Sequence, residues 1–138
     1  MSVPFAAVDV HDQHLCIRVT KPACGDNEFH RFADTVAETY VKMPHGFVLS
    51  IDMMKMERLP LNQALKWLTM FDKVSEVTKE RLVATCICFN DPLVKISTDF
   101  FLNFYNPIRP LYIFDSTEAC ELKVKQLLER ASPIATRE

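Results

Sequence analysis

The segment Leu82–Phe114 constrains the fold more than any other part of the sequence. An apolar run, Val83–Phe89, contains β-branched residues and leads into Asn-Asp-Pro at residues 90–92. A helical pattern then leads to a second apolar run, Leu111–Phe114. Two strands joined through a helix form a parallel pair with a right-handed crossover. The segment therefore predicts a β-α-β unit and, with it, an α/β fold.

The rest of the chain extends this unit. Val3–Val10 is an apolar run, and after the polar tetrad His11–His14 the residues Leu15, Ile17 and Val19 alternate with Cys16, Arg18 and Thr20. The two segments predict an antiparallel hairpin. Phe47–Met53 predicts another strand. The predicted order is β-β-α-β-α-β-α-β-α, a five-stranded, mostly parallel sheet with helices mainly on one face. Helical spacing of apolar residues predicts the helices Phe29–Val41, Leu61–Phe71, Pro92–Tyr105 and Cys120–Ala131, with Val74–Arg81 as a helix end or a short extra helix.

Length, charge and composition limit the classes of protein to which this chain can belong. The 138 residues suit one domain, residues 1–132, followed by a C-terminal tail at 133–138. The net charge is −2 and no Lys/Arg-rich run occurs, so we expect no nucleic-acid binding. No apolar run approaches the roughly 20 residues of a membrane helix, and we see no secretory signal, so we expect a cytoplasmic protein that does not span a membrane. Two glycines leave no Gly-rich phosphate loop, and we expect no cofactor.

The helix starts carry recognisable signals. Asp26 or Asn27 is expected to cap the first helix through its side-chain oxygen. Pro60 suits the first turn of the second helix, where its missing N–H is not needed. The stripe that this second helix is expected to bury comprises Leu61, Ala64, Leu65, Leu68 and Phe71, with Trp67 beside it.

Polar residues follow three strands at the edge where open α/β sheets bind ligands. Asp52 ends one strand, Asp91 follows the next, and Asn62 begins a helix. With Asp115 and Ser116, these residues predict a polar rim. The alternative, which we favour for Asp91 and Asp115, is that they only cap helices. Asp52 has no capping role to explain it and is the best polar candidate.

The third long helix carries more aromatic residues than one buried face needs. Phe100, Phe104 and Tyr105 are candidates for an exposed binding surface, because exposed aromatic patches mark such surfaces. The alternative is a wide buried face. Arg109 lies beside this group between two prolines. It can bind a partner or an anionic group through charge-assisted hydrogen bonds, or it can cap the carbonyls of the preceding helix.

Metal and thiol sites are weaker candidates. His11, Asp12 and His14 offer metal-ligating atoms, but their spacing differs from zinc patterns and turns favour these residue types anyway. Cys86 and Cys88 point to the same face of a strand and are expected to pack as small core residues. Five scattered cysteines do not suggest a disulfide framework. No local Cys/His/Asp or Ser/His/Asp pattern predicts a catalytic site.

Three segments give the chain a family resemblance. They are Phe47–Asp52, Phe89–Pro92 with the apolar helix after it, and Leu111–Ala119. In this order they resemble the STAS domain (sulfate transporter and anti-sigma-factor antagonist), whose fold group includes the CRAL-TRIO lipid-binding domains. Regulatory STAS domains carry a phosphorylatable Asp-Ser pair. The matching region here, Leu59–Asn62, contains neither residue, so the resemblance does not imply a phosphorylation switch there.

The resemblance and the missing catalytic pattern lead to one main hypothesis. We expect a non-enzymatic protein-interaction or regulatory module, with Pro60–Gln63 and Asp91–Lys95 in its contact surface. Self-association is a further expectation, because helices on one side leave the other sheet face to a partner or a second copy.

Two other hypotheses remain open. A small-ligand or lipid-binding module of CRAL-TRIO type predicts a pocket between the aromatic helix and the sheet, lined by Phe100, Phe104 and Leu68. The chain lacks the N-terminal helical region and gate helix of those domains, so a closed lipid cavity is not implied. An enzyme whose site is assembled from distant residues is the third hypothesis.

Overall fold

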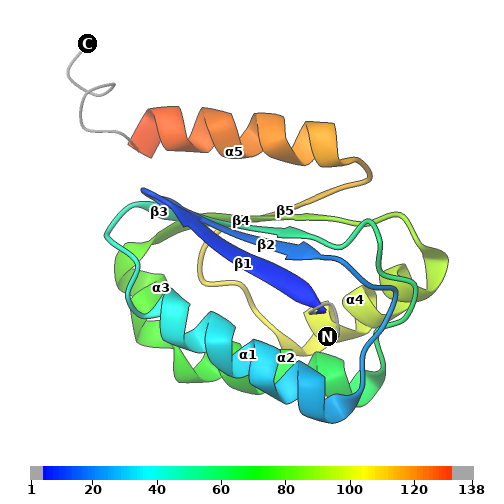
Figure 1. Cartoon of the computed structure of the whole chain (residues 1–138). Coiled ribbons are helices and arrows are strands. Elements are labelled where there is room, and N and C mark those ends of the chain that lie inside the picture. The colour runs from blue at the N-terminus through cyan, green and yellow to red at the C-terminus, as the bar shows by residue number, and fades with distance from the viewer. Residues whose placement is uncertain (1–4, 132–138) are drawn as a thin grey trace.

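A computed structural model describes residues 5–131 and confirms the predicted order of strands and helices, with α3 as a separate short helix (Figure 1). The predicted start of the first strand, before residue 5, and the predicted tail at 133–138 lie outside the described residues. The elements are β1 (Ala6–His11), β2 (His14–Val19), α1 (Asp26–Tyr40), β3 (Phe47–Asp52), α2 (Leu61–Lys73), α3 (Ser75–Arg81), β4 (Leu82–Cys88), α4 (Pro92–Phe104), β5 (Leu111–Phe114) and α5 (Thr117–Ala131).

The five strands form one sheet in the order β1-β2-β3-β4-β5. β1 and β2 pair antiparallel, and all other pairs are parallel. The hairpin turns at Asp12, which has a φ of 53°. Aspartate tolerates this left-handed conformation better than most residues because its short side chain can hydrogen-bond locally. The mostly parallel sheet with an N-terminal hairpin is therefore confirmed.

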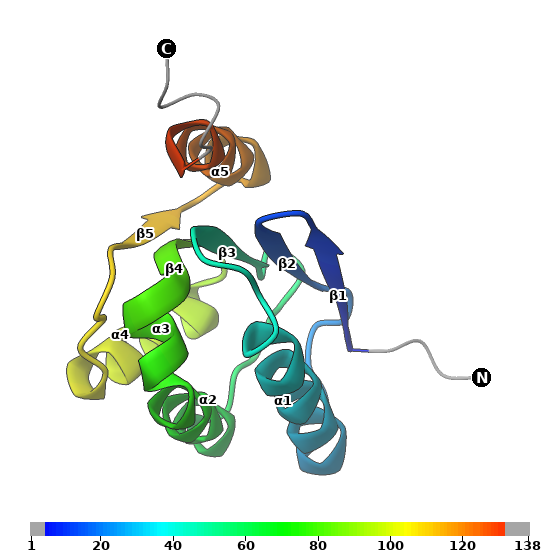
Figure 2. The same cartoon turned by 90° about the vertical axis from the view of Figure 1, so that its left-hand side faces the viewer.

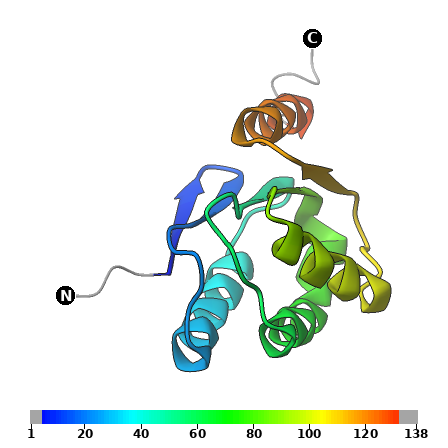
Figure 3. The same cartoon turned by 90° about the vertical axis from the view of Figure 1, so that its right-hand side faces the viewer.

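The helices lie on both faces of the sheet, but unequally. α1, α2, α3 and α4 cover one face, and α5 alone lies on the other (Figures 1 and 2). The larger core lies between the sheet and α1 and α2, and the ribbon seen from the opposite side shows the same layering (Figure 3). The side chains of this core that are most fully buried include Phe29, Tyr40, Phe47, Leu15, Ile17 and Leu49.

α5 covers the apolar part of the second sheet face. It packs Cys120, Val124 and Leu127 against a group on β3 and β4 that comprises Val48, Ala84, Cys86 and Cys88. The half of this face that belongs to the hairpin is polar and includes Asp9, His11, His14, Cys16 and Arg18. The expectation that this face needs a partner or a second copy is therefore wrong, because its apolar half already has a cover.

α2 is rotated relative to the prediction. Leu61 and Leu65 were expected inside, but they are 50% and 47% exposed. The physical reason is Trp67, whose ring meets the edges or faces of Phe29 and Phe32 on α1 at 5.7 and 5.4 Å between centroids. Burying this large ring contributes more stabilising free energy than burying one leucine, so Trp67 sets the rotation of α2. The residues that α2 buries are Gln63, Ala64, Trp67 and Met70.

Of the four helix starts with a sequence signal, those of α4 and α5 have a side-chain cap, whereas Pro60 occupies the N-cap position of α2, just before Leu61, and offers no side-chain bond. Asp91 caps α4, since its Oδ1 accepts hydrogen bonds from the backbone N–H groups of Leu93 and Val94 at 2.9 and 3.4 Å. At the start of α5 the cap is Ser116, not the favoured Asp115: its hydroxyl accepts a hydrogen bond from the N–H of Ala119 at 3.2 Å. The prediction for α1 is wrong: the capping position is Gly25, which has no side chain to offer.

Candidate functional site

Within residues 5–131, a ligand-sized hollow lies between α5 and the strands β2 and β3. Its volume of about 560 Å³ falls within the roughly 300–1,000 Å³ of small-molecule pockets. Polar side chains of the sheet line one side, and apolar side chains of α5 line the other. We call it the α5 cleft; its lining includes His14, Arg18, Ser50 and Asp52 from the sheet and Thr117, Cys120, Val124 and Leu128 from α5.

Strand geometry explains how these polar residues meet. Side chains alternate between the two faces of a strand, so every second residue of β2 and β3 points towards α5. The parallel register places Cys16 beside Ser50 and Arg18 beside Asp52. The opposite residues, such as Leu15 and Ile17, enter the main core. The sequence signal for the cleft is thus the outward half of the alternating strand, Cys16 and Arg18, which face Ser50 and Asp52 across the register.

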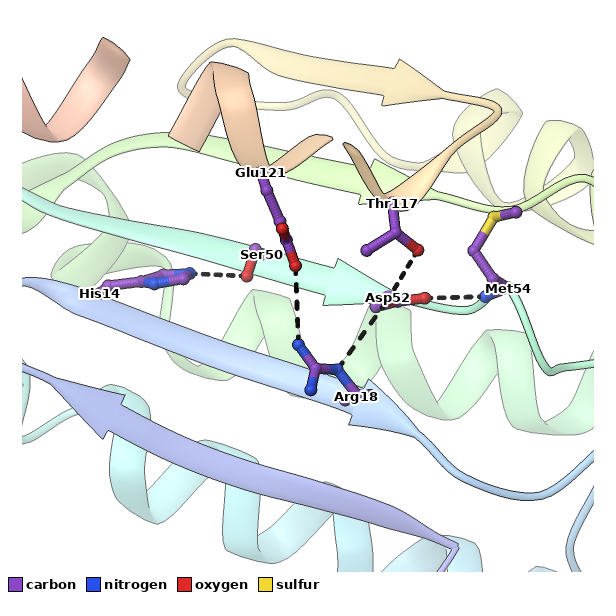
Figure 4. Close-up of polar contacts among 7 residues, drawn as sticks. All are labelled: His14, Arg18, Ser50, Asp52, Met54, Thr117 and Glu121. Atoms are coloured by element: carbon purple, nitrogen blue, oxygen red, sulfur yellow. Dashed lines mark hydrogen bonds and ion pairs between the residues drawn. The ribbon is translucent and has the colours of Figure 1, made fainter. Parts of the chain in front are cut away.

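Asp52 is the centre of a polar network at the mouth of the cleft (Figure 4). Its Oδ1 accepts a hydrogen bond from the backbone N–H of Met54 at 3.0 Å, and its Oδ2 accepts one from the hydroxyl of Thr117 at 3.2 Å. Asp52 therefore has a structural role that the sequence did not reveal: it fixes the turn after β3 and ties it to the start of α5.

Arg18 lies between two carboxylates without a close bond to either. Its Nε is 3.9 Å from Oδ2 of Asp52, and a terminal nitrogen is 3.8 Å from Oε1 of Glu121. Both distances exceed that of a hydrogen bond, so the guanidinium keeps N–H donors for a further polar group. The side chain is 55% exposed, which makes these pairs weak contributors to stability.

His14 and Ser50 form the second polar contact of the cleft, with Nε2 and Oγ 2.7 Å apart. Burial and the neighbouring His11 lower the pKa of His14, so its ring is neutral at neutral pH. A neutral imidazole can accept the hydroxyl proton. Among residues 5–131, however, no group hydrogen-bonds to Nδ1 of His14, so the orienting member of a serine triad is missing. The pair can offer a hydrogen bond to a polar group in the cleft.

The structure separates the polar residues that were predicted to form one rim. Asp52 lines the α5 cleft, and Asp91 is occupied as the cap of α4. Asn62 donates a hydrogen bond to Asp26 at 2.9 Å, and Gln63 donates to the same oxygen at 3.2 Å. These two bonds lower the pKa of Asp26 and join the starts of α1 and α2. Asn62 and Asp91 therefore have structural partners of their own.

The predicted aromatic candidates divide between two environments. Phe104 is 65% exposed, whereas Phe100 is half-buried. Tyr105 turns inward, where burial raises the pKa of its phenol, and its ring packs against Phe71 at 5.6 Å. Arg109 is exposed and donates a hydrogen bond to the carbonyl of Lys79 in α3, so it does not cap α4 as the capping alternative predicted.

The outer face of α4 carries an unbroken apolar row. Leu93 and Ile96 are 60% and 64% exposed, and with Phe100 and Phe104 they occupy positions i, i+3, i+7 and i+11 of the helix. Residues at this spacing lie along one side of a helix. We call this row the α4 stripe: Leu93, Ile96, Phe100 and Phe104.

A small cavity lies beneath α4, facing the sheet. The sequence predicted a pocket in this place lined by Phe100, Phe104 and Leu68. None of the three lines the cavity, because α2 and α4 turn other side chains inward. Its volume of about 50 Å³ holds a few water molecules, not an acyl chain. The hydroxyl of Thr98 is buried at its wall without a partner among the described residues, which suits a bound water. Its aromatic lining comprises Trp67, Phe71, Phe101 and Tyr105.

Within residues 5–131, no group of three or more His, Cys, Asp or Glu side chains is placed to hold a metal ion. In the same part of the chain, no helix has the length and apolar character needed to cross a bilayer. All five cysteines are free thiols; Cys86, Cys88 and Cys120 are buried, while Cys16 and Cys24 are partly exposed.

Comparison with known proteins identifies the fold. No family model matches the sequence, and no curated protein matches it. Among solved structures, the chain is similar to an uncharacterized DUF3478-family protein with a SpoIIAA-like fold from Shewanella loihica PV-4. The two superpose with a TM-score of 0.59 over 86% of this chain and 91% of the other, at 11% sequence identity. The likeness confirms the predicted STAS-like, SpoIIAA-like fold and, at this identity, nothing beyond the fold.

Proposed function

We propose that this chain, with its SpoIIAA-like fold, is a non-enzymatic interaction module that pairs with a second copy of itself through the α4 stripe. The observation that carries the proposal is the α4 stripe itself. Apolar groups exposed to water favour association, because each buried large side chain contributes about 1.5–3 kcal/mol. Ile96, Phe100 and Phe104 also follow one another at four-residue intervals, the spacing of the side-chain ridges that interdigitate when two helices pack. The stripe overlaps the contact surface that the sequence predicted at Asp91–Lys95.

Charge favours a second copy over an unrelated partner. Lys95 and Asp99 lie on one flank of the stripe, with Nζ and Oδ2 2.9 Å apart in the same helix. In an antiparallel pair related by a two-fold axis, this flank meets the same flank of the other copy. The Lys95–Asp99 pair of each copy then lies on the same side of the paired helices as that of the other copy. The net charge of −2 is small and opposes such pairing only weakly.

Sedimentation velocity over a concentration series tests the proposal. We expect the wild-type mass to rise from one chain to two with concentration. The double variant Ile96→Glu, Phe104→Glu should remain monomeric, with affinity weakened about 100-fold or more, since two buried apolar contacts are lost. The control is Leu122→Glu on α5, which changes a side chain of similar exposure, 58%, outside the stripe and should dimerise normally. A wild type that stays monomeric at every concentration contradicts the proposal.

A second candidate function, small-ligand binding, is favoured by the volume of the α5 cleft. This moves the expected ligand site from the 50 Å³ cavity under α4 to the opposite sheet face. The charged groups of the cleft nearly balance, with Arg18 and Lys125 against Asp52, Glu121 and Glu129. The ligand that suits such a lining is a neutral molecule with an apolar body and one hydrogen-bonding group for the Ser50–His14 pair.

Indole is a suitable probe for this cleft, because it is neutral, mainly apolar and carries one N–H. In an NMR titration, we expect amide shifts at Ser50 and Val124 and none at Thr98 in the small cavity. The variant Leu128→Trp fills the cleft and should abolish the shifts, while Leu122→Trp on the outer side of α5 should not. Shifts that persist in Leu128→Trp would place the probe elsewhere.

A further inference from the structure

Three thiols meet where α5 packs on the sheet. Cys86 and Cys88 lie on β4 and point to the α5 side, because they pair with Ser50 and Asp52 of β3. Both are fully buried, and Cys120 of α5 is 4% exposed. They belong to one apolar cluster, so their positions are fixed by the packing of helix on sheet.

Cys120 lies between the two strand thiols. Its thiol is close enough to those of Cys86 and Cys88 to shift their pKa values, and the three pack in the same cluster. The bond with Cys120 lowers the pKa of Cys86, whereas the bond with Cys86, together with burial, raises the pKa of Cys120 to about 12. The pKa of Cys88 is raised by Cys120, by burial and by Asp52. Of the three, Cys86 is therefore the thiol that most readily loses its proton to a neighbour.

The α5 cleft gives access to this cluster. Cys88 and Cys120 are part of its lining, although the cluster is otherwise enclosed. A small neutral oxidant such as hydrogen peroxide can reach Cys120 through the cleft without unfolding of the sheet. Cys16 also lines the cleft but belongs to β2, beside Ser50, and is not a member of the cluster.

We propose that hydrogen peroxide converts Cys120 and Cys86 into a disulfide that locks α5 onto β4. In the first step, Cys120 gives its proton to the neighbouring Cys86 thiolate while its sulfur attacks peroxide; the O–O bond breaks, Cys120 becomes a sulfenic acid, and the departing hydroxide takes the proton back from Cys86 to form one water. In the second step, the thiolate of Cys86 attacks that sulfur and displaces hydroxide, which takes up the proton that Cys86 lost. The pair of thiols is oxidised by two electrons, and one peroxide is reduced to two waters.

The lock has a mechanical consequence. α5 is the one described helix on its sheet face, and it forms one wall of the α5 cleft. A covalent bond from Cys120 to β4 fixes the position of that wall. It also closes a loop of the chain between residues 86 and 120, which restricts the unfolded state. We expect the oxidised protein to melt at least about 5 °C higher than the reduced protein.

Peptide mapping of the wild type after peroxide treatment tests the proposal directly. Trypsin cuts after Arg81, Lys95 and Lys123, so the expected disulfide joins the peptide of residues 82–95 to that of residues 96–123. Fragmentation of the joined peptides should assign Cys86, and dithiothreitol should reverse the change. The proposal would be overturned if the folded wild type remained unmodified after peroxide treatment, or if the disulfide formed used Cys16, Cys24 or Cys88.

Single variants provide the matched controls. Cys86→Ser and Cys120→Ser should each lose the disulfide and the rise in melting temperature. Cys16→Ser and Cys24→Ser change thiols outside the cluster and should keep both. Circular dichroism confirms that each variant is folded before oxidation. Persistence of the disulfide in a folded Cys120→Ser protein would contradict the assignment.

Discussion

Replacing Val124 by aspartate is expected to destabilise the protein by about 3–5 kcal/mol. Val124 is 5% exposed and packs on the second sheet face within the cluster that contains Val48, Ala84 and Cys88. A carboxylate at this position loses its water without gaining a partner, and an uncompensated buried charge costs about this much. The protein can relieve the cost by protonating the carboxylate or by releasing α5 from the sheet. Urea unfolding followed by circular dichroism measures the free energy of unfolding.

The control lies on the same helix. Leu122 is 58% exposed, so Leu122→Asp should change the free energy of unfolding by less than about 0.5 kcal/mol. Thiol titration adds an independent readout: in Val124→Asp the buried thiols of Cys86 and Cys88 should react as α5 detaches, and in Leu122→Asp they should remain protected. Equal stability of the two variants would mean that α5 does not hold the sheet as described.

Replacing Phe29 by alanine is expected to cost about 3–5 kcal/mol of stability. Phe29 is 1% exposed, and its ring meets Phe5, Phe32 and Trp67 at centroid distances of 6.2, 5.9 and 5.7 Å. The tilted and edge-on contacts add to the area that the ring buries. The change leaves a cavity between α1 and α2, which thermal or urea unfolding should detect as a large loss of free energy.

The same substitution on α4 serves as the control. Phe104→Ala removes an identical side chain that is 65% exposed, so the free energy of unfolding at low protein concentration should change by less than about 0.5 kcal/mol. Self-association, by contrast, should weaken in Phe104→Ala and persist in any folded Phe29→Ala protein. A Phe104→Ala variant that is as unstable as Phe29→Ala would show that Phe104 belongs to the core.

The strands and helices could be predicted because their signals are local. Alternating Leu15, Ile17 and Val19 gave one strand, and Asp91 before Pro92 gave the start of α4. In contrast, the inner face of α2 could not be predicted from spacing. Leu61, Leu65 and Trp67 are all apolar, and the choice among them depends on the rings of Phe29 and Phe32, which lie 29 or more residues away in sequence.

The candidate sites show the same division. The sequence pointed to a surplus of aromatic residues on α4, and the structure divides it into the exposed α4 stripe and an inward pair, Phe101 and Tyr105. The sequence also singled out Asp52. It did not place Arg18, Ser50 and Thr117 beside it, because these residues come from β2, β3 and α5 and meet only through strand register and helix docking.

The sequence by itself determined the order of elements, the α/β class and the likeness to a STAS-type fold. Periodicity and capping act within a few residues, so they can be read along the chain. Only the tertiary structure decided which side of each helix faces out, that α5 covers the apolar half of the second sheet face, and that a ligand-sized cleft remains beside it. Those features depend on contacts between distant segments, where the burial of large side chains outweighs local preference.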